Sequence, residues 1–521
     1  MNSYHLLFFP LTIFLLIALH PFANGQQLNP EKHVCGFHPD EEHIERLMTN
    51  LERAEELDLQ RSGVTFFIPL QFHLIARNDG TGGREIKDVL DQMCTLNDNY
   101  APYNIQFFLK DNSVNHINNT AAFNDPSNAP VILNNNRDLN AVNIYFADNT
   151  INTPGPNTTL GYYSPSFDWI VMRNDMILNH WVLSHEIGHF FSLMHTFFGW
   201  EQQPYNSNQH GNPVNQTTAP NGFTPVELAN GSNCNSAADR ICDTPPDYNF
   251  GATWGAGGGC APFTLQIRDR NNDLVQPMQN NFMSYFFNCQ QYQFTPMQVS
   301  AMQSDILSPQ RSHLRDWFNL PNVAQISDNV TPLSPTNGGT STYYDEVNLI
   351  WNEVENATAY YIEIATSPEP FFNNNVFVKE IVNSNQITLT GLSPNSQYFY
   401  KVRPVNETDY CTSLSTDFSF RTSDVPVDIE IIQEPQFNVS SAMNPIHRGE
   451  QPVLVFQNDL QTENVSFSVY SVNGQLIHSE KVDIYTGFSR VKLNTELTRA
   501  GVYFIEITSH NFRDVKQVVV Q

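Results

Sequence analysis

Three histidines and a glutamate within eleven residues have the types and the spacing of a metal site. In a helix, His185 and His189 would lie four residues apart on one face, so both imidazoles could reach one ion. Glu186 follows the first histidine and would be placed to contact a water molecule on that ion. His195 comes six residues after His189, so the helix must end near Phe191 and the chain must turn back. Three neutral imidazoles leave the fourth position of a tetrahedral Zn²⁺ open, as in catalytic rather than structural sites.

The alternative interpretation of this stretch is an amphipathic core helix with incidental histidines. The third histidine at the required spacing argues against it, because a chance match at all of these positions is rare. The sequence therefore favours a metal-binding helix.

The composition and the first residues indicate an exported protein. The 521 residues include 26 Lys and Arg against 53 Asp and Glu, which argues against binding to nucleic acid or to anionic membranes. An apolar run from Leu6 to Leu19 precedes a small-residue cleavage pattern, so we expect a signal peptide over residues 1–25, with an uncleaved anchor as the alternative. No other stretch is long and apolar enough for a membrane span, so the mature protein is expected to be secreted or at the cell surface.

Residues 26–62 are expected to form a separate pro-segment. Apolar residues recur at helical spacing from Ile44 to Leu57, and Cys35 lies upstream of that helix. A lone thiolate there could occupy the open zinc position and keep an enzyme latent. The alternatives for Cys35 are a structural disulfide and a buried small residue.

The pattern of residues 63–322 predicts an α+β domain. A strand over Phe66–Leu74 precedes a helix over Glu85–Asn97, on which Cys94 is interpreted as a core residue. Asn179 is expected to cap the zinc helix, and Thr295 and Pro296 to begin a later helix. Further strands are expected at Ile105–Leu109, Asn143–Phe146 and Trp169–Met172.

The stretch between His195 and Phe282 is long, irregular in pattern and rich in Asn, Gly and Pro. A segment of this kind inside a domain is usually functional, braced by metal or cross-linked. Two disulfides are expected, in any of three pairings, among Cys234, Cys242, Cys260 and Cys289. Candidate calcium ligands are Asp239, Asp243, Thr244 and Asp247, although aspartates in loops also serve as turn residues.

The motifs together resemble the metzincin metallopeptidases, and within them the pappalysin (cytophagalysin) family. The resemblance covers roughly residues 35–318. It rests on His185–His195 with the Met283 segment, and on these ordered motifs: Ile68-Pro-Leu-Gln-Phe-His73, Leu96-Asn97 with Asn104-Ile-Gln-Phe, His195-Thr-Phe, Cys242-Asp-Thr-Pro245 and Phe294-Thr-Pro-Met-Gln298.

The resemblance implies roles for individual residues. His185, His189 and His195 would bind zinc, and Glu186 would be the general base. Met283 would form the Met-turn floor beneath the metal, Tyr285 would stabilise the reaction intermediate, and Cys35-Gly36 would match the latency motif. Calcium and disulfides in the long loop also fit the family.

Two positions depart from the family pattern. Ser192 stands where glycine is usual, at the bend before the third histidine, so either the turn differs or hydrogen bonds compensate for the strain. Some relatives prefer arginine beside the cut bond and read it with an acidic residue after the Met-turn. Phe286-Phe287-Asn288 offers no carboxylate, so arginine specificity is not expected here.

The C-terminal part is predicted to form two all-β sandwiches. Residues 323–425 resemble a fibronectin type III domain, with Trp351 and the corner tyrosine Tyr398. Cys411 is left over in this domain and is interpreted as an inert thiol, with an intermolecular disulfide as the alternative. Within residues 428–521 stand Asn444-Pro445, Val469-Tyr-Ser-Val-Asn-Gly474-Gln, Leu497-x-x-x-Gly501-Val-Tyr-Phe-Ile-Glu-Ile507 and Val515-Lys-Gln-Val-Val-Val520. Together these motifs resemble the type A sorting domain of the type IX secretion system, which implies the secretion machinery as a partner; a generic β-sandwich is the alternative.

These observations predict a multidomain protein, with an α+β metzincin-type (zincin) catalytic domain followed by the two β-sandwiches. The leading hypothesis is a secreted, latent zinc metalloendopeptidase acting on proteins or peptides, with Ca²⁺ as a second candidate metal. The alternative is a surface adhesin or carbohydrate-binding protein with a vestigial peptidase domain.

Overall fold

The computed structural model describes residues 33–57, 64–151, 158–252, 260–315, 324–327, 329–427, 438–441, 444–458, 462–484, 487–509 and 512–521. The signal peptide expected over residues 1–25 and the end of the pro-segment near Arg61 lie outside these residues. The chain divides into two compact units, Met1–Asp424 and Val425–Gln521. No helix among the described residues is long and apolar enough to cross a membrane.

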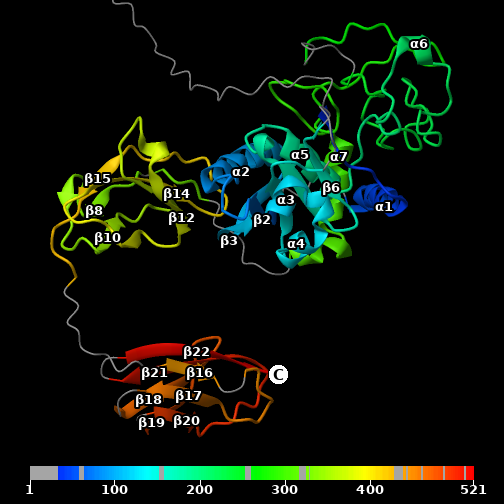
Figure 1. Cartoon of the computed structure of the whole chain (residues 1–521). Coiled ribbons are helices and arrows are strands. Elements are labelled where there is room, and N and C mark those ends of the chain that lie inside the picture. The colour runs from blue at the N-terminus through cyan, green and yellow to red at the C-terminus, as the bar shows by residue number, and fades with distance from the viewer. Residues whose placement is uncertain are drawn as a thin grey trace, which may run out of the picture. The chain divides into compact units, whose positions relative to one another are not determined.

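A five-stranded sheet forms the centre of the first unit (Figure 1). Four strands are parallel and one edge strand, β6, is antiparallel, in the order β3-β2-β4-β7-β6. Strand β2, which lies between β3 and β4, is buried on both faces from Ile68 to Ala76, as expected for a parallel strand covered on both sides. The strands are β2 (Phe66–Ala76), β3 (Ile105–Asn118), β4 (Val142–Ala147), β6 (Gly161–Ser164) and β7 (Trp169–Arg173).

Helices pack against both faces of this sheet. Alternate residues of β2, including Ile68 and Leu70, join the larger core with Val89 of α2 and Ile187 of α5. Ile75 joins a smaller core that includes Phe123 of α3 and Leu133 of α4. The helices are α2 (Ile86–Tyr100) and α5 (Val182–Phe190) for the larger core, and α3 (Thr120–Asn124) and α4 (Pro130–Asn135) for the smaller one. Short 3-10 turns join these elements at Ala101–Tyr103, Pro126–Asn128 and Asn174–Met176.

Most strand and helix predictions in this unit are confirmed, with shifted ends. The strand predicted to stop at Leu109 continues to Asn118, and the helix predicted over Glu85–Asn97 runs from Ile86 to Tyr100. Asn179 is not at the N-cap position, which is Trp181, but its side-chain oxygen accepts hydrogen bonds from the amides of Trp181 and Val182.

The chain between α5 and α7 contains one short helix, α6 (Ser207–His210), among its described residues. α7 (Pro296–Ile306) begins as predicted, because the Thr295 side chain accepts a hydrogen bond from the Gln298 amide and Pro296 is the first helical residue. The predicted pro-segment helix is α1 (Glu41–Leu57), which packs on α7. A 3-10 turn over Pro309–Leu314 follows α7.

Residues 332–421 form a β-sandwich of two sheets, in the orders β13-β10-β8 and β12-β11-β14-β15-β9. The hydroxyl of Tyr398 accepts a hydrogen bond from the Ser393 amide, the contact expected of a corner tyrosine. The strands are β8 (Pro332–Ser334), β9 (Gly339–Thr340), β10 (Glu346–Trp351), β11 (Ala359–Ala365), β12 (Val376–Val382), β13 (Gln386–Thr390), β14 (Gln397–Val405) and β15 (Phe418–Arg421), with a 3-10 turn at Phe372–Asn374.

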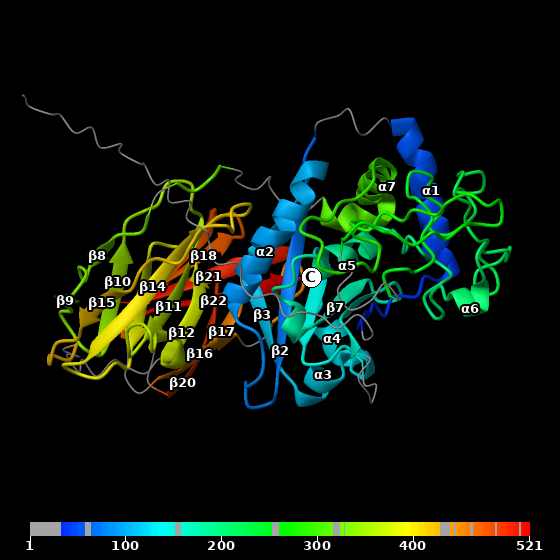
Figure 2. The same ribbon diagram turned by 90° about the horizontal axis from the view of Figure 1, so that it is seen from above.

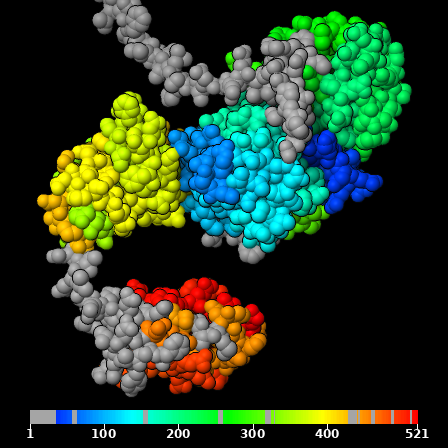
Figure 3. All heavy atoms as spheres, viewed as in Figure 1, coloured from blue at the N-terminus to red at the C-terminus, as the bar shows by residue number. Residues whose placement is uncertain are grey.

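This sandwich is fastened to α2, beside the central sheet (Figures 2 and 3). Cys94 of α2 forms a disulfide with Cys411, so the prediction of an inert thiol at Cys411 is wrong, and Cys94 is a cross-link rather than a core residue. The Arg403 guanidinium lies 2.6 Å from the Asp91 carboxylate, and the Tyr410 hydroxyl accepts a hydrogen bond from the amide of Leu109. The two cysteines are 317 residues apart, which is why sequence spacing did not pair them.

The second unit is another two-sheet sandwich with its own core, which includes Phe456, Phe467 and Ile505. Its sheets have the orders β16-β17-β20 and β19-β18-β21-β22. The strands are β16 (Asn438–Ser441), β17 (Val453–Asn458), β18 (Thr462–Ser471), β19 (Leu476–Ile484), β20 (Gly487–Lys492), β21 (Gly501–Ser509) and β22 (Phe512–Val520).

Candidate metal centre

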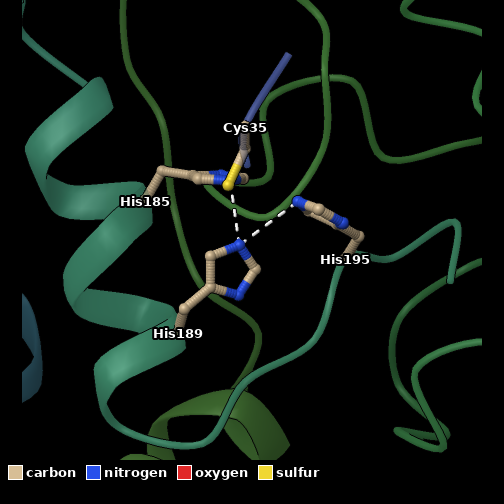
Figure 4. A group of neighbouring side chains, drawn as sticks. All are labelled: Cys35, His185, His189 and His195. Atoms are coloured by element: carbon tan, nitrogen blue, oxygen red, sulfur yellow. Dashed lines mark hydrogen bonds between the residues drawn. The ribbon is translucent and has the colours of Figure 1, made fainter. Parts of the chain in front are cut away.

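The three histidines predicted to bind zinc meet at one point of the first unit (Figure 4). His185 and His189 project from the same face of α5. The Nε2 atom of His189 lies 3.1 Å from Nε2 of His185 and 3.2 Å from Nε2 of His195. All three side chains are buried.

The third histidine reaches the site because α5 ends in a left-handed turn. Ser192 has φ of +74°, and the Leu193 amide donates to the Gly188 carbonyl to close the turn. Ser192 therefore adopts the left-handed conformation for which glycine is the usual residue at this bend. The Asn50 amide group of α1 donates a hydrogen bond of 3.0 Å to Ser192 Oγ, which offsets part of the strain.

The donor set fits a divalent cation such as zinc. The Nδ1 atom of each ring faces an acceptor: the Phe282 carbonyl for His185, the Leu193 carbonyl for His189, and the Glu201 carboxylate for His195. Each Nδ1 therefore holds the proton, and three unprotonated Nε2 atoms face one another, an arrangement that a cation would relieve. Burial favours the same neutral state, since it lowers the pKa of His185 to about 3 and holds the pKa of His189 well below its usual value.

Glu186 and Cys35 lie beside the histidines. The Cys35 thiol is 3.5 Å from Glu186 Oε2, and its sulfur lies within 4.8 Å of the three imidazole ligand atoms. Cys35 is free, so the disulfide alternative for this residue is excluded. Burial raises the pKa of Glu186 to about 8, and burial followed by the charge of Glu186 raises the pKa of the Cys35 thiol.

The residues predicted beneath and beside the metal are also present. The sulfur of Met283 packs so closely on α5 that a Cβ added to Gly188 would approach it to 2.5 Å, so any larger residue there would displace the Met283 side chain. The Tyr285 hydroxyl lies 3.3 Å from Nε2 of His195 and accepts a hydrogen bond of 2.9 Å from the Cys35 amide. Burial raises the pKa of Tyr285, so its hydroxyl stays protonated and able to donate.

Residues 33–37, within the predicted pro-segment, run through the site alongside the edge of the sheet. β1 (His33–Val34) pairs in parallel with β5 (Thr158–Thr159), and the Gly36 amide donates to the Gly161 carbonyl at 3.1 Å. The ring of Phe37 stacks on His189 with centroids 3.9 Å apart. Backbone pairing, the thiol and an aromatic ring thus cover the histidines together.

The sequence did not identify Glu201 as part of the site. Its Oε1 lies 3.3 Å from Nδ1 of His195, and its Oε2 accepts a hydrogen bond from the Gly199 amide. Carboxylates that hold the second nitrogen of a metal-binding histidine orient the ring and raise its basicity. No spacing motif marks this residue, so only the folded turn after His195 reveals it.

The long loop is held by the four cysteines expected to pair. The disulfides are Cys234–Cys242 and Cys260–Cys289, one of the three pairings left open. The second bridge fixes the segment that follows Tyr285. These cross-links brace a stretch whose described residues contain one short helix, α6.

Two of the four candidate calcium ligands make hydrogen bonds with other segments of the chain. Asp243 accepts hydrogen bonds from Thr295 and from the Met297 amide at the start of α7. Asp247 accepts hydrogen bonds from Ser284 and Thr196.

Asp239 and Thr244 are in contact, with 3.0 Å between Oδ1 and Oγ1. Asp239 Oδ2 and Glu227 Oε2 are both buried, and neither has a hydrogen-bond partner among the described residues. Burial, then the charges of Asp239 and Asp247, raises the pKa of Glu227. Glu227 is a carboxylate that the sequence analysis missed.

Comparison with known proteins gives two informative matches. The family model of the secretion system C-terminal sorting domain matches residues 453–521, which confirms a C-terminal sorting domain. The chain is also similar to an extracellular metalloprotease of Colletotrichum graminicola (strain M1.001 / M2 / FGSC 10212). The two are 25% identical over 294 residues, a match that covers 52% of this chain and 88% of the relative.

Solved structures of fibronectin-type modules also match. The Clostridium thermocellum CbhA fibronectin(III)-like modules are 13% identical, cover 37% of this chain and 94% of their own, and give a TM-score of 0.15. FN3tt is 20% identical, with 19% and 99% covered and a TM-score of 0.14. Scores this low carry no argument, and the sandwich architecture rests on the strand pairing described above.

Proposed function

We propose that the protein is a secreted zinc metalloendopeptidase made as a latent precursor. The observation that carries the proposal is the convergence of three unprotonated imidazole nitrogens beside a buried carboxylate, Glu186. The similarity to an extracellular metalloprotease supports the protease class, and the sorting domain supports export through the type IX secretion machinery.

His185, His189 and His195 would hold the zinc, with Glu201 orienting the last of them. When bound, zinc supplies Lewis-acid polarisation of the scissile carbonyl and of the attacking water. Glu186 would accept the proton of that water and pass it to the leaving amine. Tyr285 donates a hydrogen bond to the oxygen on which negative charge develops.

The pro-segment would act as the lock. In the precursor the thiol of Cys35 would lie at the open side of the three histidines. The backbone amide of Cys35 donates a hydrogen bond to the Tyr285 hydroxyl. A bound cation would favour the thiolate form of Cys35 despite its burial, so Cys35 and the three histidines together would hold the ion. Release of the pro-segment would open the fourth position and free Tyr285.

A second metal site would stabilise the long loop. The buried oxygens of Glu227 and Asp239 that have no hydrogen-bond partner, with Thr244 beside them, suit Ca²⁺. Adding calcium to the calcium-free protein should raise its unfolding temperature, and Glu227→Gln should abolish that rise. Equal responses in both proteins would reject the site.

The elements described support the following domain arrangement. Residues 63–322 would form the catalytic domain, residues 323–425 a fibronectin-type domain fixed to it, and residues 428–521 the sorting domain.

Metal analysis with a cleavage assay tests the proposed function. The matured protein should contain one zinc ion, lose cleavage of a denatured protein substrate when the metal is chelated, and recover it when zinc is returned. His189→Ala should lose both the metal and the activity, whereas Glu346→Ala, an exposed strand position on the sandwich, should change neither. Cleavage that continues without metal would reject the proposal.

A further inference from the structure

The carboxylate of Asp247, in the long loop, is buried behind the proposed catalytic centre. Its Oδ2 atom accepts a hydrogen bond of 2.6 Å from the Ser284 hydroxyl and one of 3.2 Å from the Thr196 hydroxyl. Its Oδ1 atom accepts a hydrogen bond of 3.1 Å from the Phe250 amide. Asp247, Ser284 and Thr196 are each at most 2% exposed. A buried carboxylate is costly unless it is hydrogen-bonded in this way, so these contacts hold its partners firmly in place.

Both hydroxyl partners of Asp247 are sequence neighbours of residues in the proposed site. Thr196 directly follows His195, and Ser284 directly precedes Tyr285. These two segments are far apart in the sequence, and Asp247 accepts from both with a single oxygen atom. Asp247 therefore joins the segment that carries the third histidine to the segment that carries Tyr285.

The residues that follow Asp247 lie against the same two segments. A Cβ added to Gly251 would lie 2.3 Å from the carbonyl carbon of Tyr285, so the backbone at Gly251 packs directly on the Tyr285 backbone. The side-chain amide of Asn249 donates a hydrogen bond of 3.1 Å to the Trp200 carbonyl, in the turn after His195. Residues 247–251 thus form one support behind both sides of the site.

The geometry that this support would control is the placement of Tyr285 beside His195. The Tyr285 hydroxyl lies 3.3 Å from Nε2 of His195, and the two ring centroids are 5.0 Å apart. A group that stabilises developing charge must be in place before the reaction begins. A displacement of about 1 Å can lower the rate roughly a hundredfold.

We infer that Asp247 is a positioning residue for the proposed reaction, because it sets the place of Tyr285 relative to His195. The inference rests on the proposed function, since it needs cleavage at the three histidines. Asp247 acts through the hydroxyls of Ser284 and Thr196 and takes no part in the proton transfer. A carboxylate suits this role because its two oxygens can accept several hydrogen bonds at once, whereas the NH₂ group of an asparagine accepts none.

Kinetics of matured, zinc-loaded Asp247→Asn test the inference. The substitution keeps the shape of the side chain and replaces one acceptor oxygen by a donor group. We expect kcat for a short peptide to fall by roughly tenfold or more. KM should change by less than about twofold, since substrate binding is left intact, and the variant should still bind one equivalent of zinc. A wild-type kcat, or a loss confined to KM, would overturn the inference.

A double-mutant cycle with Tyr285→Phe distinguishes positioning from a general loss of structure. If Asp247 acts through Tyr285, then Asp247→Asn should lower kcat by less than about threefold once the tyrosine hydroxyl is absent. The same fold loss in both backgrounds would contradict the inference. So would a Tyr285→Phe enzyme with the wild-type kcat.

Asp269→Asn is the matched control. Asp269 is buried in the same loop and accepts hydrogen bonds from the amides of Ala229 and Asp273. Its variant should keep the wild-type kcat, and coupling of Asp269 to Tyr285 as strong as that of Asp247 would remove the support for a specific role.

Thr196→Val provides a second variant if Asp247→Asn does not fold. It removes one hydroxyl partner of Asp247 and keeps the shape of the side chain. A smaller loss of kcat is expected, with the same coupling to Tyr285→Phe. A folded Thr196→Val enzyme without that coupling would contradict the inference.

The outcomes separate the two proposals. Absence of cleavage in the zinc-loaded wild type, or full cleavage in its Glu186→Ala variant, rejects the proposed function and the inference with it. Glu186-dependent cleavage that Asp247→Asn leaves unchanged rejects the inference alone.

Discussion

The side-chain amide of Asn50 donates a hydrogen bond of 3.0 Å to Ser192 Oγ, which connects the pro-segment helix to the turn that brings in the third histidine. The same amide group donates to Asp305 at 2.8 Å, and Asn50 is buried. Arg46 on the same helix donates to the Phe190 carbonyl at the end of α5. The pro-segment is therefore attached at two places: by Cys35 at the histidines and by α1 behind them.

The contact at Asn50 predicts that α1 contributes to inhibition independently of the thiol. Asn50→Ala removes the donor that Asp305 and Ser192 share in this buried contact. Binding of the pro-segment should therefore weaken by about 1–3 kcal/mol. A pro-segment peptide added to the matured enzyme should then inhibit at least fivefold more weakly than the wild-type peptide.

Thr49→Ala serves as the control for Asn50→Ala. Thr49 is the preceding residue of α1 and is exposed, so its variant should inhibit like the wild-type peptide. Equal inhibition by the Asn50→Ala and wild-type peptides would show that α1 adds nothing to latency.

The position of Cys35 predicts that the Cys35→Ala precursor is active without processing. Cys35→Ala removes the sulfur from the open side of the histidines, so a small peptide substrate should be cut by the unprocessed chain. Activity should remain below that of the matured enzyme, because Phe37 still stacks on His189. We would measure the cleavage rates of the wild-type and Cys35→Ala precursors and follow the integrity of the pro-segment on gels. A Cys35→Ala precursor as inactive as the wild type would refute the thiol lock.

The Cys94–Cys411 bridge predicts that the fibronectin-type sandwich is a fixed part of the peptidase unit. Replacing both cysteines by serine should lower the free energy of unfolding by about 2–4 kcal/mol. The active site lies elsewhere, so kcat for a short peptide should be unchanged. Denaturant unfolding and peptide kinetics together check this, and a large loss of kcat with unchanged stability would be inconsistent with a bracing role.

The burial of His43 in α1 predicts that the stability of the precursor depends on pH. Burial, then the charge of Arg46, lowers the pKa of His43 from 6.5 to about 3. Because the unfolded chain binds a proton that the folded precursor excludes, stability is full above pH 6.5 and is lost as the pH falls toward 3. The loss should be about 1.4 kcal/mol per pH unit.

The comparison with His43→Phe isolates this contribution. Unfolding of the zinc-loaded wild-type and variant precursors is measured at pH 7.5 and 5.5. The variant should lose less stability between these two values, by about 1.4 kcal/mol. Equal losses in the two proteins would exclude His43 as the group responsible.

The parts of the site that the sequence predicted are those encoded by local spacing. His185 and His189 belong to one helix, and the need for His195 to turn back led directly to the bend at Ser192. The start of α7 was likewise predicted from Thr295 and Pro296, because caps and first-turn prolines act over a few residues.

The parts that the sequence did not predict depend on contacts between distant segments. Asn50 and Ser192 are 142 residues apart, and no local rule pairs them. Glu227 becomes notable only because folding buries its carboxylate near Asp239. Pairing of this kind follows from the topology of the sheet and the loop, which spacing along the chain does not encode.

The most direct test of the central claim is zinc content and peptide cleavage measured together on matured Glu186→Ala. Glu186 is not among the zinc ligands in our account, so the variant should bind one equivalent of zinc, as the wild type does. Without the carboxylate that accepts the proton, cleavage should fall by at least a hundredfold. A zinc-loaded Glu186→Ala enzyme that cleaves at the wild-type rate would contradict the account.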